Sequence, residues 1–404
     1  MRRFAWAMTA GGAALFLLLA VTLVPWHPYP GGALHPPPAD TVFTSAQIAR
    51  ASAYSHAARW LSRTDLLVTL AVGCALGFTS FGRRVAARVR GPWLWRATVL
   101  VVVSLVLGRL AGLPIAIALQ REDLRYDLSR QTWSAYARDT ALGMLVTAVA
   151  TVVAVIVLLA VIRRFPRAWP MIAGAAIAAL VLLGSFVYPL LVEPLFNHFE
   201  PLPDGSLRSQ VMRLAAEEHV RLDDVLVSDA SRRTTELNAY VTGFGSTRRV
   251  VLYDNLVRDV PRGQVLSVVA HELGHARHDD VLTGTLLGIA AAFVGVGLLG
   301  LLVGRRYDGL RDPAVVPLLL ALFALGSTLA LPIENTISRQ IEARADVDAL
   351  ITTRDEASFV ALQRQLAVSS LADPTPPAWS QFCFGSHPTA LQRIAMAGRI
   401  LGGR

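Results

Sequence analysis

The chain has 404 residues, a mean hydropathy of +0.47 and only 17% charged residues. Soluble globular domains carry about 25% charged residues, so this composition excludes a soluble globular protein. The formal net charge is +9, and all 38 basic residues are arginine. In a membrane protein clustered arginine chiefly determines topology. No nucleic-acid-binding motif accompanies the charge, so we expect no nucleic-acid partner. The exclusive use of arginine is typical of a GC-rich genome and favours a bacterial source.

Seven apolar segments approach or exceed the roughly 20 residues that span a bilayer. They predict an α-helical polytopic protein with about seven membrane helices. The first segment follows Arg2 and Arg3, but its apolar core is too long for a signal peptide. We expect a multi-pass protein, in the cell membrane if the source is bacterial. The segments are 4–25, 65–82, 93–120, 140–162, 170–192, 281–303 and 314–333.

Polar sequence separates these segments. The loop 27–64 is rich in proline and glycine in its first half and reads as an amphipathic helix in its second half. A second polar loop covers 121–139, and the largest polar block follows the fifth span. The chain therefore divides into membrane helices one to five with two loops (1–193), a polar unit (194–280), membrane helices six and seven (281–333) and a polar tail (334–404).

The polar unit changes its periodicity along the chain. Residues 205–220 read as a helix that starts at Ser206. Short β-rich runs follow at 223–229, 238–244 and 248–254, and the last two flank a Gly-Ser-Thr turn that predicts a hairpin. The segment 263–280 then reads as a helix. We expect a small α+β unit inserted between spans five and six and completed by the tail.

The helical segment contains the pattern HELGH at 271–275. Residues four apart lie on one face of a helix, so His271 and His275 can share one zinc ion. Glu272 then lies beside the metal, where it can take a proton from a metal-bound water. A hydrolytic zinc site also needs a third protein ligand and one open position.

The third ligand is expected on a second helix, within 334–350. Glu342 lies 67 residues after His275, and the antiparallel spans six and seven fill that interval and return the chain to the same side. Glu334 is the competing carboxylate, although it can instead cap the start of the helix. Asp346 lies one turn after Glu342, where it can accept the second N–H of a zinc-bound histidine or be a surface charge. We expect His278 to be solvated at the membrane boundary.

With these motifs, the sequence resembles the type I CAAX prenyl proteases, which are integral-membrane zinc metalloproteases. The resemblance covers most of the chain from about residue 41, in the order of the family. It implies seven membrane helices that enclose a large water-filled chamber, with the zinc site at its edge. The matching segments are PLFNHFEPLPDGSL (194–207), NAYVTGFGSTRRVVLYDNLV (238–257), VVAHELGHARHDD (268–280), SRQIEARAD (338–346) and SHPTALQRI (386–394).

The resemblance also implies roles for single residues. It assigns one zinc ion per chain to His271, His275 and Glu342, and general-base catalysis to Glu272.

Three further positions are implied to serve the substrate. Asn238 would hold the substrate backbone, His387 would stabilise the oxyanion of the scissile carbonyl, and Arg393 would lie near that site. An imidazole N–H directed at a developing oxyanion lowers the barrier, and a strand edge such as 238–244 can pair with an extended peptide. The alternatives are a strand-start residue, a loop residue and a structural ion pair, respectively.

The sequence thus predicts a zinc metalloendopeptidase that, by resemblance, removes the C-terminal tripeptide of CAAX-type prenylated proteins. Its expected partners are the lipid bilayer and a peptide or protein substrate, lipidated or membrane-embedded. One alternative is membrane-protein quality control by a protease of the HtpX type. Another, of a different class, is a transporter or a catalytically silent membrane scaffold. Cys74 and Cys383 are expected to be unpaired thiols.

The sidedness of the site has two interpretations. Seven spans place the polar unit and the tail opposite the N-terminus, and the family resemblance implies that they face the cytoplasm. The positive-inside rule favours the reverse. Thirteen arginines, Arg305 and Arg306 among them, lie on the N-terminal side, whereas the first two loops of the other side hold seven.

Overall fold

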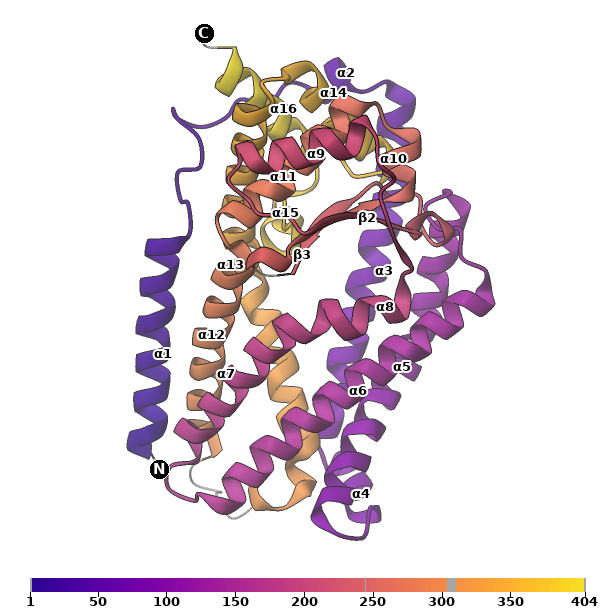
Figure 1. Cartoon of the computed structure of the whole chain (residues 1–404). Helices are drawn as coiled ribbons and strands as arrows, with labels where there is room; N and C mark the ends of the chain where they lie inside the picture. The colour runs from indigo at the N-terminus through magenta and orange to yellow at the C-terminus, as the bar shows by residue number, and fades with distance from the viewer. Residues whose placement is uncertain (1, 244, 304–309, 403–404) are drawn as a thin grey trace.

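The computed structural model describes residues 2–243, 245–303 and 310–402. Arg305 and Arg306, counted above for topology, lie outside these ranges. Within them, six helices are long and apolar enough to cross a membrane, and a bent helix pair makes a seventh span if it is counted as one. The predicted polytopic α-helical class is confirmed. Figure 1 shows the spans between the end that holds the N-terminus and the end that holds the sheet.

The seven predicted apolar segments coincide with long helices, and several of these helices extend beyond the segments, whereas segments 4–25, 65–82 and 170–192 run past the ends of theirs. Thr44 starts α3 with a capping box, and the predicted amphipathic helix and the second span are one unbroken helix. The polar loop predicted at 121–139 was wrong, because only 126–132 separates α5 from α6. The helices of this region are α1 (Arg2–Leu23), α2 (Ala39–Val42), α3 (Ser45–Phe78), α4 (Ser80–Arg88), α5 (Trp93–Arg125), α6 (Trp133–Arg164), α7 (Trp169–Val187), α12 (Asp280–Val303) and α13 (Val316–Thr353).

The fifth span is bent where it approaches the α+β unit. After α7 the chain forms a π-helical turn over Tyr188–Val192 and then α8 (Glu193–Phe196), with a bend of 48°. Proline and π-turns are the usual causes of helix kinks, and Pro189 lies inside this turn. The bend directs the chain out of the span and into the sheet.

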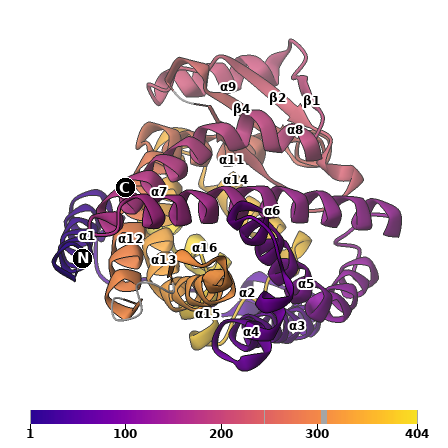
Figure 2. The same ribbon diagram turned by 90° about the horizontal axis from the view of Figure 1, so that it is seen from below.

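The membrane helices do not form a tightly packed bundle. In the most apolar stretch of each of the six long spans, the buried share ranges from 6% in α3 to 33% in α12. Seen from below, α1 and α12 lie at one side of the molecule and α3 and α5 at the other (Figure 2). The two pairs of helices therefore lie on opposite sides of the membrane region.

The α+β unit contains a four-stranded sheet in the order β1-β2-β4-β3. The three predicted β-rich runs and the hairpin are confirmed; β1 was not predicted, because three residues give no measurable alternation. β2 and β4 are parallel and the other pairs antiparallel. β3 is the last strand in this order and therefore an edge strand, and it lies beside α11 (Arg262–Arg277). The strands are β1 (Phe199–Pro201), β2 (Asp224–Ser228), β3 (Ala239–Thr242) and β4 (Arg249–Tyr253).

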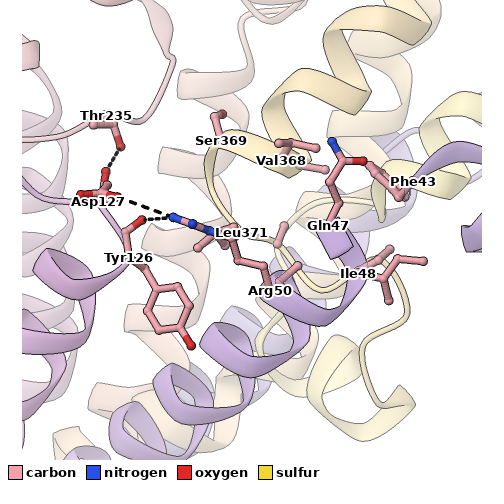
Figure 3. Close-up of a pocket in the computed structure, with 14 residues that line it drawn as sticks. Phe43, Gln47, Ile48, Arg50, Tyr126, Asp127, Thr235, Val368, Ser369 and Leu371 are labelled. Atoms are coloured by element: carbon pink, nitrogen blue, oxygen red, sulfur yellow. Dashed lines mark hydrogen bonds and ion pairs between the residues drawn. The ribbon is translucent and has the colours of Figure 1, made fainter. Parts of the chain in front are cut away.

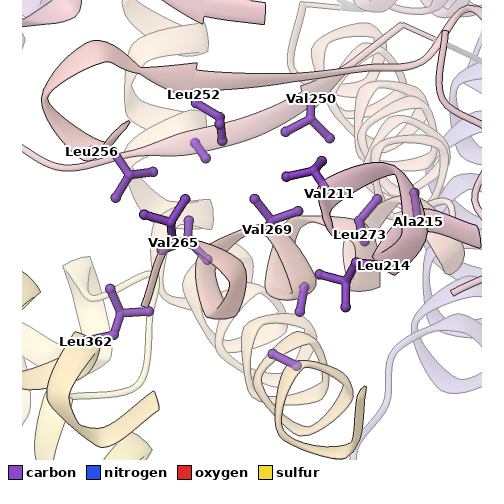
Figure 4. Packing of buried hydrophobic residues seen from close by; sticks show 14 of the residues in the cluster. Val211, Leu214, Ala215, Val250, Leu252, Leu256, Val265, Val269, Leu273 and Leu362 are labelled. Carbon is purple, nitrogen blue, oxygen red and sulfur yellow. The ribbon is translucent and has the colours of Figure 1, made fainter. Parts of the chain in front are cut away.

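One hydrophobic core joins this sheet to the C-terminal tail (Figure 4). Val250 and Leu252 of β4 pack against Val269 and Leu273 of α11, and Leu362 of α14 closes the cluster. Each fully buried side chain of this size stabilises the fold by roughly 1.5–3 kcal/mol, so the tail is part of the unit. The helices of the unit are α9 (Ser206–Glu217), α10 (Asp254–Asp259), α11 (Arg262–Arg277), α14 (Glu356–Ser369), α15 (Ala378–Phe384) and α16 (Ala390–Leu401).

The seventh span continues without a break into the tail. Helix α13 passes through Pro332 and ends at Thr353. Glu334 is therefore an exposed residue in the middle of a helix, and the interpretation that it caps a helix start was wrong. Cys74 and Cys383 are both free, as predicted.

Small residues allow α1 and α12 to approach closely. A Cβ atom at Gly12 would lie 2.8 Å from Cβ of Phe293 and 2.9 Å from the backbone nitrogen of Val294, whereas one at Gly11 would meet nothing within 4 Å.

We expect Gly12→Val to destabilise the protein by about 1–3 kcal/mol, because overpacking at backbone contacts displaces the helices. The matched variant Gly11→Val should be close to wild type. Thermal unfolding of both variants in detergent measures the difference. Equal midpoints for the two variants would contradict this packing.

Candidate metal centre

Helix α11 presents two histidines on one side because its other side is buried. Val265, Val269 and Leu273 face the core, which fixes the rotation of the helix. His271 and His275 are one turn apart, and their ring centroids are separated by 4.8 Å. Both rings reach the side of α11 that meets α13.

Glu342 of α13 completes a compact group of three donors. The two histidine Nε2 atoms are 3.2 Å apart. Glu342 Oε2 lies 3.2 Å from Nε2 of His271, and Oε1 lies 3.6 Å from Nε2 of His275. The structure thus brings together the three residues predicted as metal ligands, and Glu342 rather than Glu334 is the carboxylate beside the histidines.

A buried carboxylate orients the first histidine. Asp346 is fully shielded from solvent, and its Oδ1 lies 2.9 Å from Nδ1 of His271. Arg393 of α16 donates to both oxygens of Asp346, with Nε at 2.7 Å from Oδ2. Arg393 therefore acts on the site through Asp346.

A second carboxylate orients the other histidine in the same way, and the sequence analysis did not identify it. Asp280 Oδ2 lies 2.9 Å from Nδ1 of His275, and Arg344 of α13 donates to the other oxygen of Asp280. Asp279 adopts a positive φ of 52° after the end of α11, and this left-handed residue turns the chain so that Asp280 faces back toward the helix. The available signal was an acidic residue five positions after His275.

These contacts fix the tautomers of the two rings. An ionised carboxylate only accepts hydrogen bonds, so each Nδ1 carries a proton and each neutral ring directs its Nε2 lone pair at the other and at Glu342. Only a cation, either a proton or a metal ion, relieves the repulsion between these lone pairs. Burial lowers the pKa of His271, but hydrogen bonds to Asp346 and Glu342 outweigh burial and raise its pKa to about 10. The cluster thus binds a positive charge strongly.

The charge balance indicates a divalent ion. With neutral histidines, the three partnered carboxylates and two guanidinium groups give the cluster a net charge of −1 (−3 + 2), which becomes −2 when Glu272 is ionised. Buried charge is costly unless it is compensated, and one divalent metal ion compensates it. The carboxylates are Glu272, Asp280, Glu342 and Asp346, and the guanidinium groups are Arg344 and Arg393.

Glu272 differs from the other three carboxylates because it has no partner. Among the described residues none forms a hydrogen bond or ion pair with it. Burial raises its pKa, and the charge of Glu342 adds to this effect while His271 and His275 oppose it. A carboxylate with a raised pKa and a free oxygen can accept and return a proton near neutral pH.

The segment before α16 brings His387 to the cluster. Thr389 starts α16 with a capping box to Gln392, which sets the position of the preceding residues. His387 Nε2 lies 3.3 Å from Oε2 of Glu342, and its Nδ1 lies 2.8 Å from Oγ of Ser386. The structure therefore brings His387 beside the predicted ligands.

Asn238 is not part of this group. It is exposed immediately before the edge strand β3, and its side chain accepts from the backbone N–H of Ala239. No described contact links it to the histidines. His278, expected to be solvated, is instead 2.9 Å from Oδ2 of Asp348 and about one third exposed; the end of α11 faces α13, which supplies this partner.

A separate cavity of about 310 Å³ lies away from this cluster (Figure 3). It is lined by residues of α3 and α14 and by the loop at Asp127, and Arg50 donates to the carbonyl of Tyr126 at its edge. None of the predicted site residues lines it.

The fold and the site together define a polytopic membrane metallopeptidase. A family model described as Peptidase family M48 matches residues 201–400, and one described as CAAX prenyl protease N-terminal, five membrane helices, matches residues 32–198. The two models together cover most of the chain. The chain belongs to the M48 metallopeptidases of the CAAX prenyl protease type.

Individual relatives agree with this assignment. The Uncharacterized metalloprotease YhfN of Bacillus subtilis (strain 168) is 29% identical over 74% of this chain and 72% of its own length. The CAAX prenyl protease 1 homolog of Oryza sativa subsp. japonica is 28% identical over 68% of this chain and 66% of its own length. The crystal structure of S. mikatae Ste24p has a TM-score of 0.76 at 18% identity and covers 98% of this chain and 99% of that chain. This likeness confirms the predicted fold.

We expect Asp280→Asn to weaken metal affinity by about 10- to 100-fold, because carboxylates that orient a ligating histidine contribute this much. Competition with a chelator measures the change. The neighbouring variant Asp279→Asn, which alters an exposed residue paired with Arg248, should keep wild-type affinity. A similar loss in both variants would assign the effect to the turn rather than to His275.

Metal binding should also release close to one proton per ion at pH 7.5. His271 is protonated there without metal, because its pKa lies near 10, and a ligating imidazole must be neutral. Affinity should therefore fall as the pH falls. Calorimetry in buffers of different ionisation enthalpy counts the protons, and a count of zero would contradict this coupling.

Proposed function

We propose that this protein is a zinc-dependent endopeptidase of a bacterial cell membrane. The observation that carries the proposal is the arrangement of His271, His275 and Glu342 around one point with the unpartnered Glu272 beside them. Two imidazoles and one carboxylate form a common ligand set of hydrolytic zinc sites. Their separations of 3.2–3.6 Å are close to the edge of about 3.3 Å of a tetrahedron with zinc–ligand bonds of 2.0–2.1 Å.

The residues of the chain divide the chemistry between them. A bound zinc ion would supply a lowered water pKa and a polarised substrate carbonyl. Glu272 accepts the proton of the attacking water and gives it to the leaving amine as the peptide bond breaks. A Ser386 hydroxyl that donates to Nδ1 of His387 leaves the proton on Nε2, which can donate to the developing oxyanion.

The edge strand β3 supports a peptide substrate. Its outer edge has no strand partner in the sheet, and the strand lies beside α11. An extended peptide can add to such an edge through backbone hydrogen bonds. We assign Asn238, at the entrance to this strand, to holding the substrate backbone near the scissile bond.

The preferred substrate is a prenylated protein that loses its C-terminal tripeptide. The family models and the relatives named CAAX prenyl protease 1 support this class. The Bacillus relative and the all-arginine composition support the bacterial membrane. Quality control of unprenylated membrane proteins is the second candidate, because the Bacillus relative has no assigned substrate in its name.

We expect Glu272→Gln to retain zinc and to lose about 100- to 10,000-fold in kcat on a farnesylated peptide, because an amide cannot accept the proton. The measurement is cleavage by detergent-purified protein, followed by mass spectrometry. Glu334→Gln, the same substitution at an exposed position, should be fully active.

Full activity of Glu272→Gln would contradict the mechanism. Cleavage of an unprenylated membrane peptide, with the farnesylated one untouched, would keep the mechanism and favour quality control.

A further inference from the structure

Helix α3 carries an arginine for which the described residues supply no ionic partner. The guanidinium carbon of Arg63 lies 3.4 Å from the ring centroid of Phe384. Its Nε atom is shielded from solvent and has no hydrogen-bond partner among the described residues. No ion pair within that part of the chain involves Arg63 either. A guanidinium inside a membrane protein is costly unless it meets an anion or water.

The charged neighbours of Arg63 do not fill this role. Asp373 is already paired with Arg59, one turn earlier on the same face of α3, at 2.7 Å. Asp65 lies against Gly112 of α5, on the side of the helix that faces away from α15. Arg63 is therefore prepared for an anion from outside the described chain.

The stacking geometry favours a planar anion. A guanidinium that stacks on an aromatic ring uses its face and leaves its N–H groups free along its edge. That edge matches the two oxygens of a carboxylate in a bidentate pair. The chemistry of the expected ligand is therefore a carboxylate.

Phe384 connects Arg63 to the segment that carries His387. Phe384, at the end of α15, is three residues before His387, so their Cα atoms are at most about 11 Å apart. His387 in turn lies 3.3 Å from Glu342. Gln381 donates to the carbonyl of His387 at 2.7 Å, which ties α15 to this segment. An extended tripeptide spans about 10 Å, which is comparable with this maximum separation.

We propose that Arg63 binds the free C-terminal carboxylate of the substrate and so selects peptide bonds a few residues from a chain end. The inference rests on the proposed peptidase function and deepens it. The carboxylate ends on Arg63 while the scissile carbonyl lies between His387 and the metal ligands. Internal peptide bonds, which lack a carboxylate at this distance, are then poor substrates.

The test compares two farnesylated peptides that differ only in a C-terminal carboxylate or carboxamide. Wild-type protein should prefer the acid by about 10- to 100-fold in kcat/KM, the range for a hydrogen bond to a charged group. Arg63→Gln should lose this preference and keep the rate on the amide. Arg50→Gln removes a charge from an exposed residue of the same helix and should keep the preference.

Binding to the Glu272→Gln protein decides the question without turnover. Fluorescence anisotropy should show tighter binding of the acid than of the amide, and the double variant with Arg63→Gln should bind both equally. An unchanged acid preference in Arg63→Gln, or no preference in the wild type, would overturn the proposal. The proposal would also be overturned if the wild type showed no acid preference but retained an anionic lipid that Arg63→Gln lost. Cleavage of both peptides by Glu272→Gln at the wild-type rate would instead sink the proposed function.

Discussion

The metal centre depends on one interaction that the structure uses twice. Each imidazole is held by a carboxylate, and an arginine holds that carboxylate: His271 by Asp346 and Arg393, and His275 by Asp280 and Arg344. The six residues come from α11, α12, α13 and α16. Because a carboxylate fixes the tautomer and direction of a ligating ring, the site exists only when membrane helices and tail are packed together.

Helix continuity sets the place of this site relative to the membrane. Glu342 lies nine residues after the end of the predicted seventh apolar segment, which is about 14 Å along a helix. The helix does not break between them, so the span and the ligand move as one rigid element. Asp280, which begins α12, ties the sixth span to the same centre. A hydrolytic site can thus lie beside apolar helices while its ligands stand beyond their most apolar part.

The sequence predicted that these three donors lie together, for two reasons. Helical spacing places His271 and His275 on one face, and an antiparallel pair of spans returns Glu342 to them. Asp280 was not predicted, because its contact requires a left-handed residue at Asp279, and sequence alone does not show which Asp adopts that conformation. Hydropathy located the spans but not the ends of α3 and α13, since apolar composition reports contact with lipid and not where a helix stops. The contact of His278 could not be predicted either, because its partner Asp348 lies 70 residues away in the sequence.

The charge of the cluster connects metal, protons and folding. When Glu272 is ionised, four carboxylates and two guanidinium groups leave a deficit of two positive charges in a mostly buried site. Protons can fill part of this deficit, which is why the pKa of His271 rises. A divalent ion would fill all of it and would leave Glu272 ionised and unpartnered, the state that the proposed general base requires. The residues that would bind the metal thus also leave Glu272 without a partner, because the arginines are committed to Asp280 and Asp346.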